Sequence, residues 1–101
     1  MFRVRAFLVL SIAAAALALQ ACATSPPVQE MSDARQAVAA AEQANAETLA
    51  PDTFEQARRL LETAERQLRD QAYGPARVNA VRAKNRAVQA LEASQAAQEP
   101  N

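Results

Sequence analysis

The sequence predicts an all-α fold, a short antiparallel three-helix bundle in which a helical hairpin packs with an N-terminal helix, behind a cleaved lipoprotein signal peptide. The 101 residues include 27 alanines and only one glycine, and alanine is the strongest helix former. Beyond residue 32, Pro51 and the pair Gly74-Pro75 mark two breaks. Between these breaks, apolar residues recur every three or four positions, as on one face of a helix.

Residues 1–21 have the pattern of a lipoprotein signal peptide. Two arginines lie among the first five residues, and the apolar stretch 6–19 follows. This stretch is shorter than the roughly 20 residues that span a bilayer. It ends in the residues LQAC at positions 19–22, which resemble the lipobox of bacterial lipoproteins. The resemblance implies cleavage between Ala21 and Cys22 and a lipid on Cys22.

Two other interpretations of this segment stay open. An uncleaved N-terminal membrane anchor also has a basic start and an apolar run, and a soluble secreted protein could be cut near residues 21–23 and keep a free thiol. Lipidation is favoured because a lone cysteine in an exported chain has no disulfide partner. By resemblance to enterobacterial lipoproteins, Ala23 in place of aspartate implies transfer to the outer membrane, where we expect the chain to face the periplasm.

The residues after the lipobox are expected to connect the lipid to a folded domain. They show no apolar period, and Pro26-Pro27 interrupts them. The predicted divisions are residues 1–21 as signal peptide, residues 22–31 as lipidated cysteine and flexible tether, residues 32–97 as an alanine-rich three-helix domain, and residues 98–101 as a tail.

The first predicted helix begins at Ser32, a favourable N-cap, and runs to about Leu49. Pro51 suits the first turn of a second helix, in which Asp52 and Glu55 have the spacing of a capping box. This second helix is strongly amphipathic, so one face must be buried. Its apolar face consists of Phe54, Ala57, Leu60, Leu61, Ala64 and Leu68. Its polar face contains three pairs at favourable i,i+4 spacing, Glu55–Arg59, Glu62–Arg66 and Glu65–Arg69.

The second helix is expected to end near Ala72, where Gly74 would adopt the left-handed C-cap conformation before a third helix that runs to about Ala97. This third helix has two apolar arcs, which suggests two neighbours. Asn85 interrupts the first arc, where a polar residue can fix the pairing register. The first arc consists of Val78, Val81, Val88 and Leu91, and the second of Ala76, Ala80, Ala83, Ala87 and Ala90.

Charge is unevenly distributed along the chain. Residues 30–57 contain six acidic side chains and one basic one, whereas residues 71–91 contain four basic side chains and no acidic one. The basic group is the candidate interaction surface, for the first helix of the same chain or for an acidic partner, although a solvated face is the simpler explanation. Its members are Arg77, Arg82, Lys84 and Arg86. A formal net charge of zero gives no indication of nucleic-acid binding.

Catalytic and metal sites are not expected. The chain has no histidine, and its only cysteine is assigned to the lipid, so the residues for Ser–His chemistry, Cys–His chemistry and most zinc sites are missing. One glycine cannot build a phosphate-binding loop. We therefore expect no enzymatic activity, no cofactor, no metal and no small-molecule substrate.

Residues 31–97 combine an A-x-x-A-x-x-A first helix, an AP break at residues 50–51, an A-x-x-x-L second helix and an alanine-rich third helix. This pattern resembles an uncharacterised family of small alanine-rich lipoproteins of Gram-negative bacteria. In longer relatives of that family, a domain of unknown function precedes an OmpA-like peptidoglycan-binding domain. The resemblance implies an envelope location, and the family has no established activity.

The leading functional expectation is a lipid-anchored cell-envelope helical interaction or scaffold module, with another envelope protein or a second copy as its partner. The alternative is a structural outer-membrane spacer lipoprotein that forms a helical oligomer, similar to the major murein lipoprotein. Pro51 and Gly74-Pro75 argue against one uninterrupted coil. A tetratricopeptide-like adaptor is less well supported, because no 34-residue repeat is visible.

Overall fold

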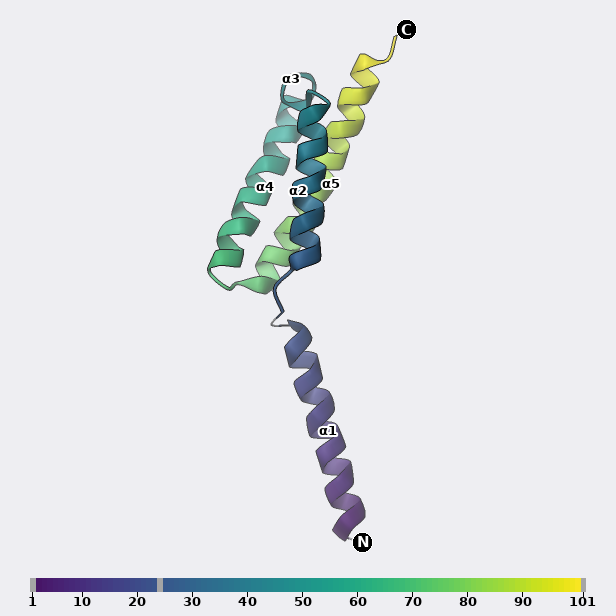
Figure 1. Cartoon of the computed structure of the whole chain (residues 1–101), viewed down its shortest axis with the longest axis vertical. Coiled ribbons are helices and arrows are strands. Elements are labelled where there is room, and N and C mark those ends of the chain that lie inside the picture. The colour runs from purple at the N-terminus through teal and green to yellow at the C-terminus, as the bar shows by residue number, and fades with distance from the viewer. Residues whose placement is uncertain (1, 24, 101) are drawn as a thin grey trace.

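The computed structural model describes the backbone of residues 2–23 and 25–100 and the side chains of residues 3–15 and 25–100. These residues form five helices and are all-α, as predicted: α1 (Phe2–Ala23), α2 (Val28–Gln43), α3 (Ala46–Leu49), α4 (Pro51–Arg69) and α5 (Tyr73–Gln98). Helices α2, α4 and α5 pack against one another, and α4 runs opposite to the other two (Figure 1). We call these packed helices, with the short α3, the helical domain. The molecule is elongated, with principal extents of 78 × 30 × 15 Å.

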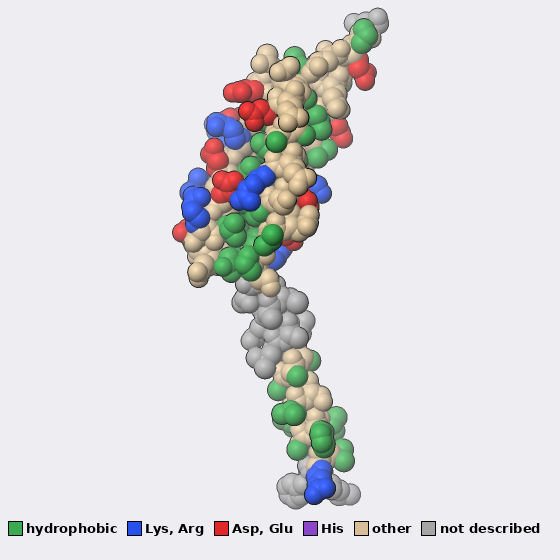
Figure 2. Space-filling model, in the orientation of Figure 1, with side chains coloured by type: hydrophobic (Ala, Val, Ile, Leu, Met, Phe, Trp, Pro, Cys, Tyr) green, Lys and Arg blue, Asp and Glu red, His purple; other side chains and the backbone are tan. Residues whose placement is uncertain are grey.

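Helix α1 extends away from the helical domain (Figure 1), and its described side chains, residues 3–15, are mostly apolar, with basic ones at the N-terminal end (Figure 2). Among residues 3–15, whose side chains are described, the large apolar side chains are 58–71% exposed, and they are Val4, Phe7, Leu8, Val9, Leu10 and Ile12. Among the described residues, no helix combines the length and the apolar character needed to cross a membrane. The backbone of Ala21 and Cys22 belongs to α1, but the side chains at the predicted cleavage and lipidation site lie outside the described residues.

The first helix of the domain begins four residues before the predicted Ser32. It begins at Val28, directly after Pro27, and the Pro27 carbonyl accepts a hydrogen bond from the backbone N–H of Met31 at 3.0 Å. Pro27 and Met31 are both fully buried. Burial of these two side chains explains the early start, because it provides apolar contacts that the sequence pattern alone does not reveal. The predicted flexible tether at residues 22–31 is therefore wrong at its C-terminal end, since residues 28–31 are helical.

Arg77 on α5 connects the beginning of the domain to its last helix. Its Nε lies 3.3 Å from Glu30 Oε1, and its Nη2 donates a hydrogen bond to the Ser25 carbonyl oxygen at 3.1 Å. The Arg77 and Glu30 side chains are 33% and 32% exposed, so water screens this ion pair less than a fully exposed one. Arg77, predicted as part of an interaction surface, thus holds the chain segment before α2 against α5.

The first predicted helix is interrupted before Leu49. Helix α2 ends at Gln43, Asn45 adopts the left-handed conformation with φ 61°, and the single-turn α3 follows. Asparagine tolerates this conformation better than most residues. The Asn45 carbonyl accepts the backbone N–H of Leu49 at 2.9 Å, and Ala46 is fully buried. The break redirects the chain toward α4.

Helix α4 begins at Pro51, as predicted, but without the predicted capping box. Ala50 occupies the N-cap position, and no side chain caps the helix. The Ala50 backbone has φ −142° and ψ 58°, outside the helical region, as expected for a residue before proline. Glu55 instead pairs with Arg58 and Arg59.

The turn between α4 and α5 is a Schellman motif that does not use the glycine. Helix α4 ends at Arg69, three residues before the predicted end, and Gln71 adopts the left-handed conformation with φ 61°. The backbone N–H of Ala72 donates to the Gln67 carbonyl at 2.8 Å, and that of Gln71 to the Leu68 carbonyl at 3.1 Å. These are the two hydrogen bonds that define the motif.

The prediction that Gly74 forms the left-handed C-cap is wrong. Gly74 lies in the first turn of α5 and has no positive φ. It directly precedes Pro75, and a side chain on the residue before a proline disfavours helical geometry. Glycine at this position lets the helix include the proline in its first turn.

Gln71→Gly is expected to raise the free energy of unfolding by about 0.5–1 kcal/mol, because glycine adopts the left-handed conformation without steric strain. Gln71→Val is expected to lower it by about 1 kcal/mol, because a β-branched side chain fits this conformation poorly. Urea denaturation followed by circular dichroism measures both. Shifts of the same sign in both variants would contradict the left-handed turn.

The core of the helical domain is built on a row of small side chains along α5. We call these fully buried residues the alanine row: Ala76, Ala80, Ala83, Ala87, Ala90 and Ser94. Small side chains allow helix axes to approach closely. Ser94 continues the row because its hydroxyl donates to the Ala90 carbonyl at 2.7 Å, which satisfies the buried polar group.

The expectation that α5 has two neighbours is confirmed, but the division of the contacts between two apolar arcs is not observed. Both α2 and α4 pack on α5, and the buried apolar residues of α5 all belong to the alanine row. Val78 and Val81, which were expected in the core, are 50% and 42% exposed. Since the two neighbours share one row of small residues, Val78 and Val81 are left outside, whereas Leu91 of the same arc packs against the core.

Candidate functional site

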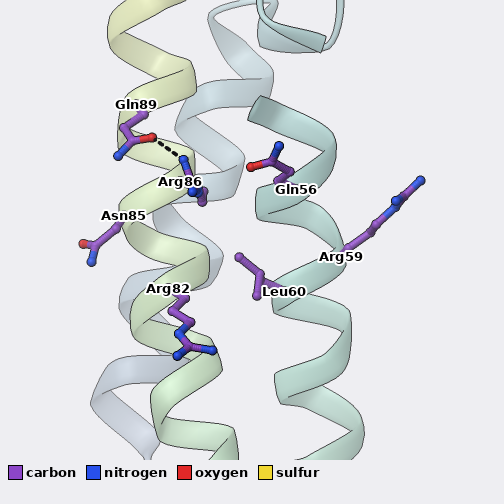
Figure 3. Close-up of a pocket in the computed structure, with 7 residues that line it drawn as sticks. All are labelled: Gln56, Arg59, Leu60, Arg82, Asn85, Arg86 and Gln89. Atoms are coloured by element: carbon purple, nitrogen blue, oxygen red, sulfur yellow. Dashed lines mark hydrogen bonds between the residues drawn. The ribbon is translucent and has the colours of Figure 1, made fainter. Parts of the chain in front are cut away.

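An open groove of about 590 Å³ lies between α4 and α5. In Figure 3, Leu60 points from α4 toward α5, whereas Arg59 and Asn85 point away from the space between the helices. The side chains of Arg82 and Arg86 lie on the α5 side of this space. The lining residues, which we call the basic groove, are Gln56, Arg59, Leu60, Arg82, Asn85, Arg86 and Gln89.

Helical periodicity explains why these residues meet. Arg82, Asn85, Arg86 and Gln89 are three or four positions apart, so they lie on one side of α5. Leu60 is partly buried against the core cluster that contains Ala80 and Ala83. Leu60 therefore provides an apolar contact within an otherwise polar groove.

The groove has an unbalanced positive charge. Three arginines and no acidic side chain line it. Arg86 donates a hydrogen bond to Gln89 Oε1 at 3.0 Å, drawn as a dashed line in Figure 3. Within the described part of the chain, Arg82 has no hydrogen-bonded or ionic partner. A carboxylate from outside can therefore bind Arg82 without breaking an existing ion pair.

Arg59 differs from the other two arginines because Glu55 holds it along α4. Its Nε lies 3.3 Å from Glu55 Oε1. Arg58 donates two hydrogen bonds to the same carboxylate, at 2.9 and 3.1 Å, and these bonds lower the pKa of Glu55. The same interaction raises the pKa of Arg58. Glu55 therefore stays ionised and keeps Arg59 directed away from the groove.

The other two predicted pairs on α4 are replaced by different ones. Glu62 pairs with Arg58 at 3.5 Å, and Glu65 pairs with Arg35 of α2 at 3.4 Å. The Glu55–Arg59 pair is confirmed. All these side chains are about one-third or more exposed, so water screens each pair and its contribution to stability is small.

The four predicted interaction residues do not form one surface. Arg82 and Arg86 line the basic groove. Lys84 is exposed, but it lies two positions from Arg82 and from Arg86 in the sequence. A difference of two positions is a rotation of about 200° around the helix axis, so Lys84 lies on another side of α5. Arg77 is bound to Glu30. The sequence thus identified two of the seven groove residues, Arg82 and Arg86.

The amide and leucine residues of the groove were missed as site residues. Leu60 was assigned to the core, and the uncharged Gln56 and Gln89 attract no attention in a charge pattern. The available signal was the spacing of long polar side chains three and four positions from Arg82 and Arg86 along α5.

A second feature lies beside the groove on α5. We call Val78, Val81, Asn85 and Val88 the valine stripe, and their 3-4-3 spacing places them along one side of the helix. The first three are exposed and Val88 is half-buried. Asn85 belongs to both the stripe and the groove. Large apolar side chains exposed in a row are typical of a surface that binds another protein.

These two features suit binding. Among the residues that the structure describes, no three metal-ligating side chains are grouped together. The lining of the groove consists of guanidinium, amide and apolar groups. Such a lining recognises an anionic group by charge and hydrogen bonds.

Residues 29–100 match the family model DUF4398, described as a domain of unknown function. The chain belongs to the DUF4398 family. The match covers nearly all of α2 and the whole of α3, α4 and α5, and it confirms the expectation of an uncharacterised family. Comparison with curated proteins and with solved structures finds no significant match. The basic groove and the valine stripe lie within the DUF4398 domain.

Proposed function

We propose that this protein is a lipid-anchored helical interaction module of the bacterial cell envelope, held at the outer membrane through Cys22 and facing the periplasm. The observation that carries the interaction role is the uncovered valine stripe beside the basic groove on α5. The alanine row, in contrast, is already buried within the chain. The exposed surface of α5 therefore presents valine and arginine side chains, whereas the contacts inside the helical domain use alanine.

The lipid anchor is supported by the character of α1. Its described apolar side chains between residues 4 and 12 are exposed, and Arg3 and Arg5 lie at the start of this segment. A helix that belonged to the folded core would bury one face, whereas a signal segment interacts with the membrane before cleavage. Cys22 follows this segment in the LQAC sequence, and the resemblance to small lipoproteins with OmpA-like relatives agrees with an envelope location.

The interaction module is favoured over the spacer by the place of the alanines. A spacer that forms a helical oligomer would use the alanine faces of its helices as the assembly interface. In this chain, α2 and α4 cover the alanine row of α5. Assembly through this row would require the helical domain to open.

Cys22→Ser tests the anchor. We expect the wild-type full chain, expressed in an enterobacterial host, to incorporate radiolabelled palmitate and to fractionate with the outer membrane. The variant is expected to lose the label and to leave the outer-membrane fraction, because serine provides no thiol for the lipid. A variant that stays in the outer membrane like the wild type would refute the lipid anchor.

Ala23→Asp is the matched control and tests the location. Cys22 is unchanged in this variant, so we expect it to keep the palmitate label. By resemblance to enterobacterial lipoproteins, aspartate after the cysteine is expected to retain the chain at the inner membrane. Labelled Ala23→Asp protein in the outer membrane would show that another signal sets the destination.

A further inference from the structure

We infer that the valine stripe and the basic residues on its two flanks together bind an acidic amphipathic helix of another protein, which lies along α5. This inference rests on the proposed role as an interaction module, and it specifies the chemistry of the partner. Three observations carry it: the spacing of the stripe, the position of Asn85, and the charge on both sides of the stripe.

The spacing of the valine stripe points to a helical partner. Residues 78, 81, 85 and 88 follow the 3-4-3 pattern of the a and d positions of a coiled coil. They extend over about 15 Å of helix, or about three turns. A helix with the same repeat can insert its apolar side chains between these residues. An extended peptide, whose side chains alternate every two residues, has no such match.

Asn85 occupies the middle of this pattern, where the other three positions are valine. It is exposed and points outward from α5 (Figure 3), so its amide is solvated in the unbound chain. Within a helix pair, an asparagine at this position selects a partner with a facing polar side chain and thereby fixes the register. The partner helix is therefore expected to have one polar residue within its apolar stripe.

The charges beside the stripe indicate that the partner is acidic. Arg82 and Arg86 lie on the groove side, and Lys84 lies on the other side. No acidic residue occurs between residues 71 and 91 of the chain. Carboxylates on both flanks of a partner helix would pair with these basic residues, which speeds association and excludes basic partners.

A second copy of the chain is a poor occupant for the same reason. Two valine stripes facing each other would bring Arg82 and Lys84 of one copy close to the same basic flanks of the other. Like charges at these flanking positions disfavour pairing. The charge pattern thus favours a different, acidic chain.

Two synthetic helices test the inference. Both have about three heptads, with leucine at the a and d positions and one central asparagine. The glutamate peptide has glutamate at all e and g positions, and the lysine peptide has lysine there. The labelled peptides are titrated with the full chain in detergent, and binding is measured by fluorescence anisotropy. We expect the glutamate peptide to bind and the lysine peptide to bind at least tenfold more weakly.

Variants of the full chain connect this binding to named residues. Val81→Asp is expected to weaken binding of the glutamate peptide at least tenfold, because it places a charge within the apolar stripe. The double variant Arg82→Glu, Arg86→Glu is expected to reverse the preference and bind the lysine peptide better. Gain of lysine-peptide binding cannot result from misfolding. Arg69→Glu, an exposed charge change near the end of α4, is the control and is expected to leave the preference unchanged.

Three kinds of result would overturn the inference. In the peptide titrations, equal binding of both peptides would refute the acidic partner, and binding that Val81→Asp does not change would exclude the valine stripe as the contact. Dimerisation of the full chain in sedimentation experiments, lost in Val81→Asp, would assign the stripe to a second copy. Binding to phosphatidylglycerol vesicles without any peptide binding would assign the basic residues to a lipid surface. The Cys22→Ser fractionation is independent of all three, so failure of the anchor and failure of this inference are distinguishable.

Discussion

Replacing Phe54 with alanine is expected to lower the free energy of unfolding by about 3–5 kcal/mol. Phe54 is 4% exposed and lies in a cluster with Val38, Ala57 and Ala87. It is the largest side chain of that cluster, and the other fully buried members are alanines, so its removal leaves a cavity. Because a domain of this size is stable by only about 5–15 kcal/mol, this loss is a large part of the total. Urea denaturation followed by circular dichroism measures it.

Val78→Ala is the control for this experiment. Val78 is 50% exposed, so its truncation is expected to change the free energy of unfolding by at most about 0.5 kcal/mol. A large loss for Val78→Ala and a small one for Phe54→Ala would mean that the valine arc forms the core. That result would contradict the packing of α5 described above.

Replacing Ala83 with leucine is expected to destabilise the helical domain by about 3 kcal/mol. Ala83 is fully buried in a cluster with Met31, Ala34 and Ala64, which come from α2 and α4. The three additional carbon atoms of leucine have no free space there, so helix α5 must move away from both neighbours. The expected result is a lower urea midpoint.

Ala93→Leu is the matched control, because it makes the same change at an exposed position of the same helix. Its free energy of unfolding is expected to stay within about 0.5 kcal/mol of the wild-type value. Equal stabilities of Ala83→Leu and Ala93→Leu would show that the alanine row does not hold the helices together.

The second helix was the best predicted element. Its start at Pro51 and its apolar face with Phe54, Ala57 and Ala64 agree with α4. Strong periodicity and a proline at the first turn act locally, so they can be recognised without knowledge of the rest of the chain.

The turns were predicted less well because their left-handed residues are not glycine. Asn45 and Gln71 both have φ 61°, and Gln71 has no sequence signal for this conformation. The one glycine drew the prediction to residue 74, where the following proline explains its presence. Hydrogen bonds of Ala72 and Gln71 to α4 stabilise the turn, and they form only once the helix ends at that point.

The burial of α5 depends on its neighbours, and this limited the prediction of the site. The valine and alanine arcs are both apolar in sequence. The alanines face inward because the three helices pack closely, and close packing leaves room only for small side chains between them. Likewise, Arg77 and Glu30 are 47 positions apart, so no local pattern reveals that they form an ion pair. Arg82 and Arg86, in contrast, can be identified from charge alone.

The hydrogen bond from Arg77 to the Ser25 carbonyl oxygen limits how far the helical domain can lie from Cys22. In a chain anchored through Cys22, Ser25 follows the lipid-bearing residue by three positions, a distance of at most about 11 Å. Helix α5 has 26 residues and a length of about 39 Å. Arg82 and Arg86 follow its first residue by about 14 and 20 Å along the axis. With this anchor, the basic groove would lie within a few tens of ångströms of the membrane surface, where a partner anchored in the same membrane could meet it by lateral diffusion.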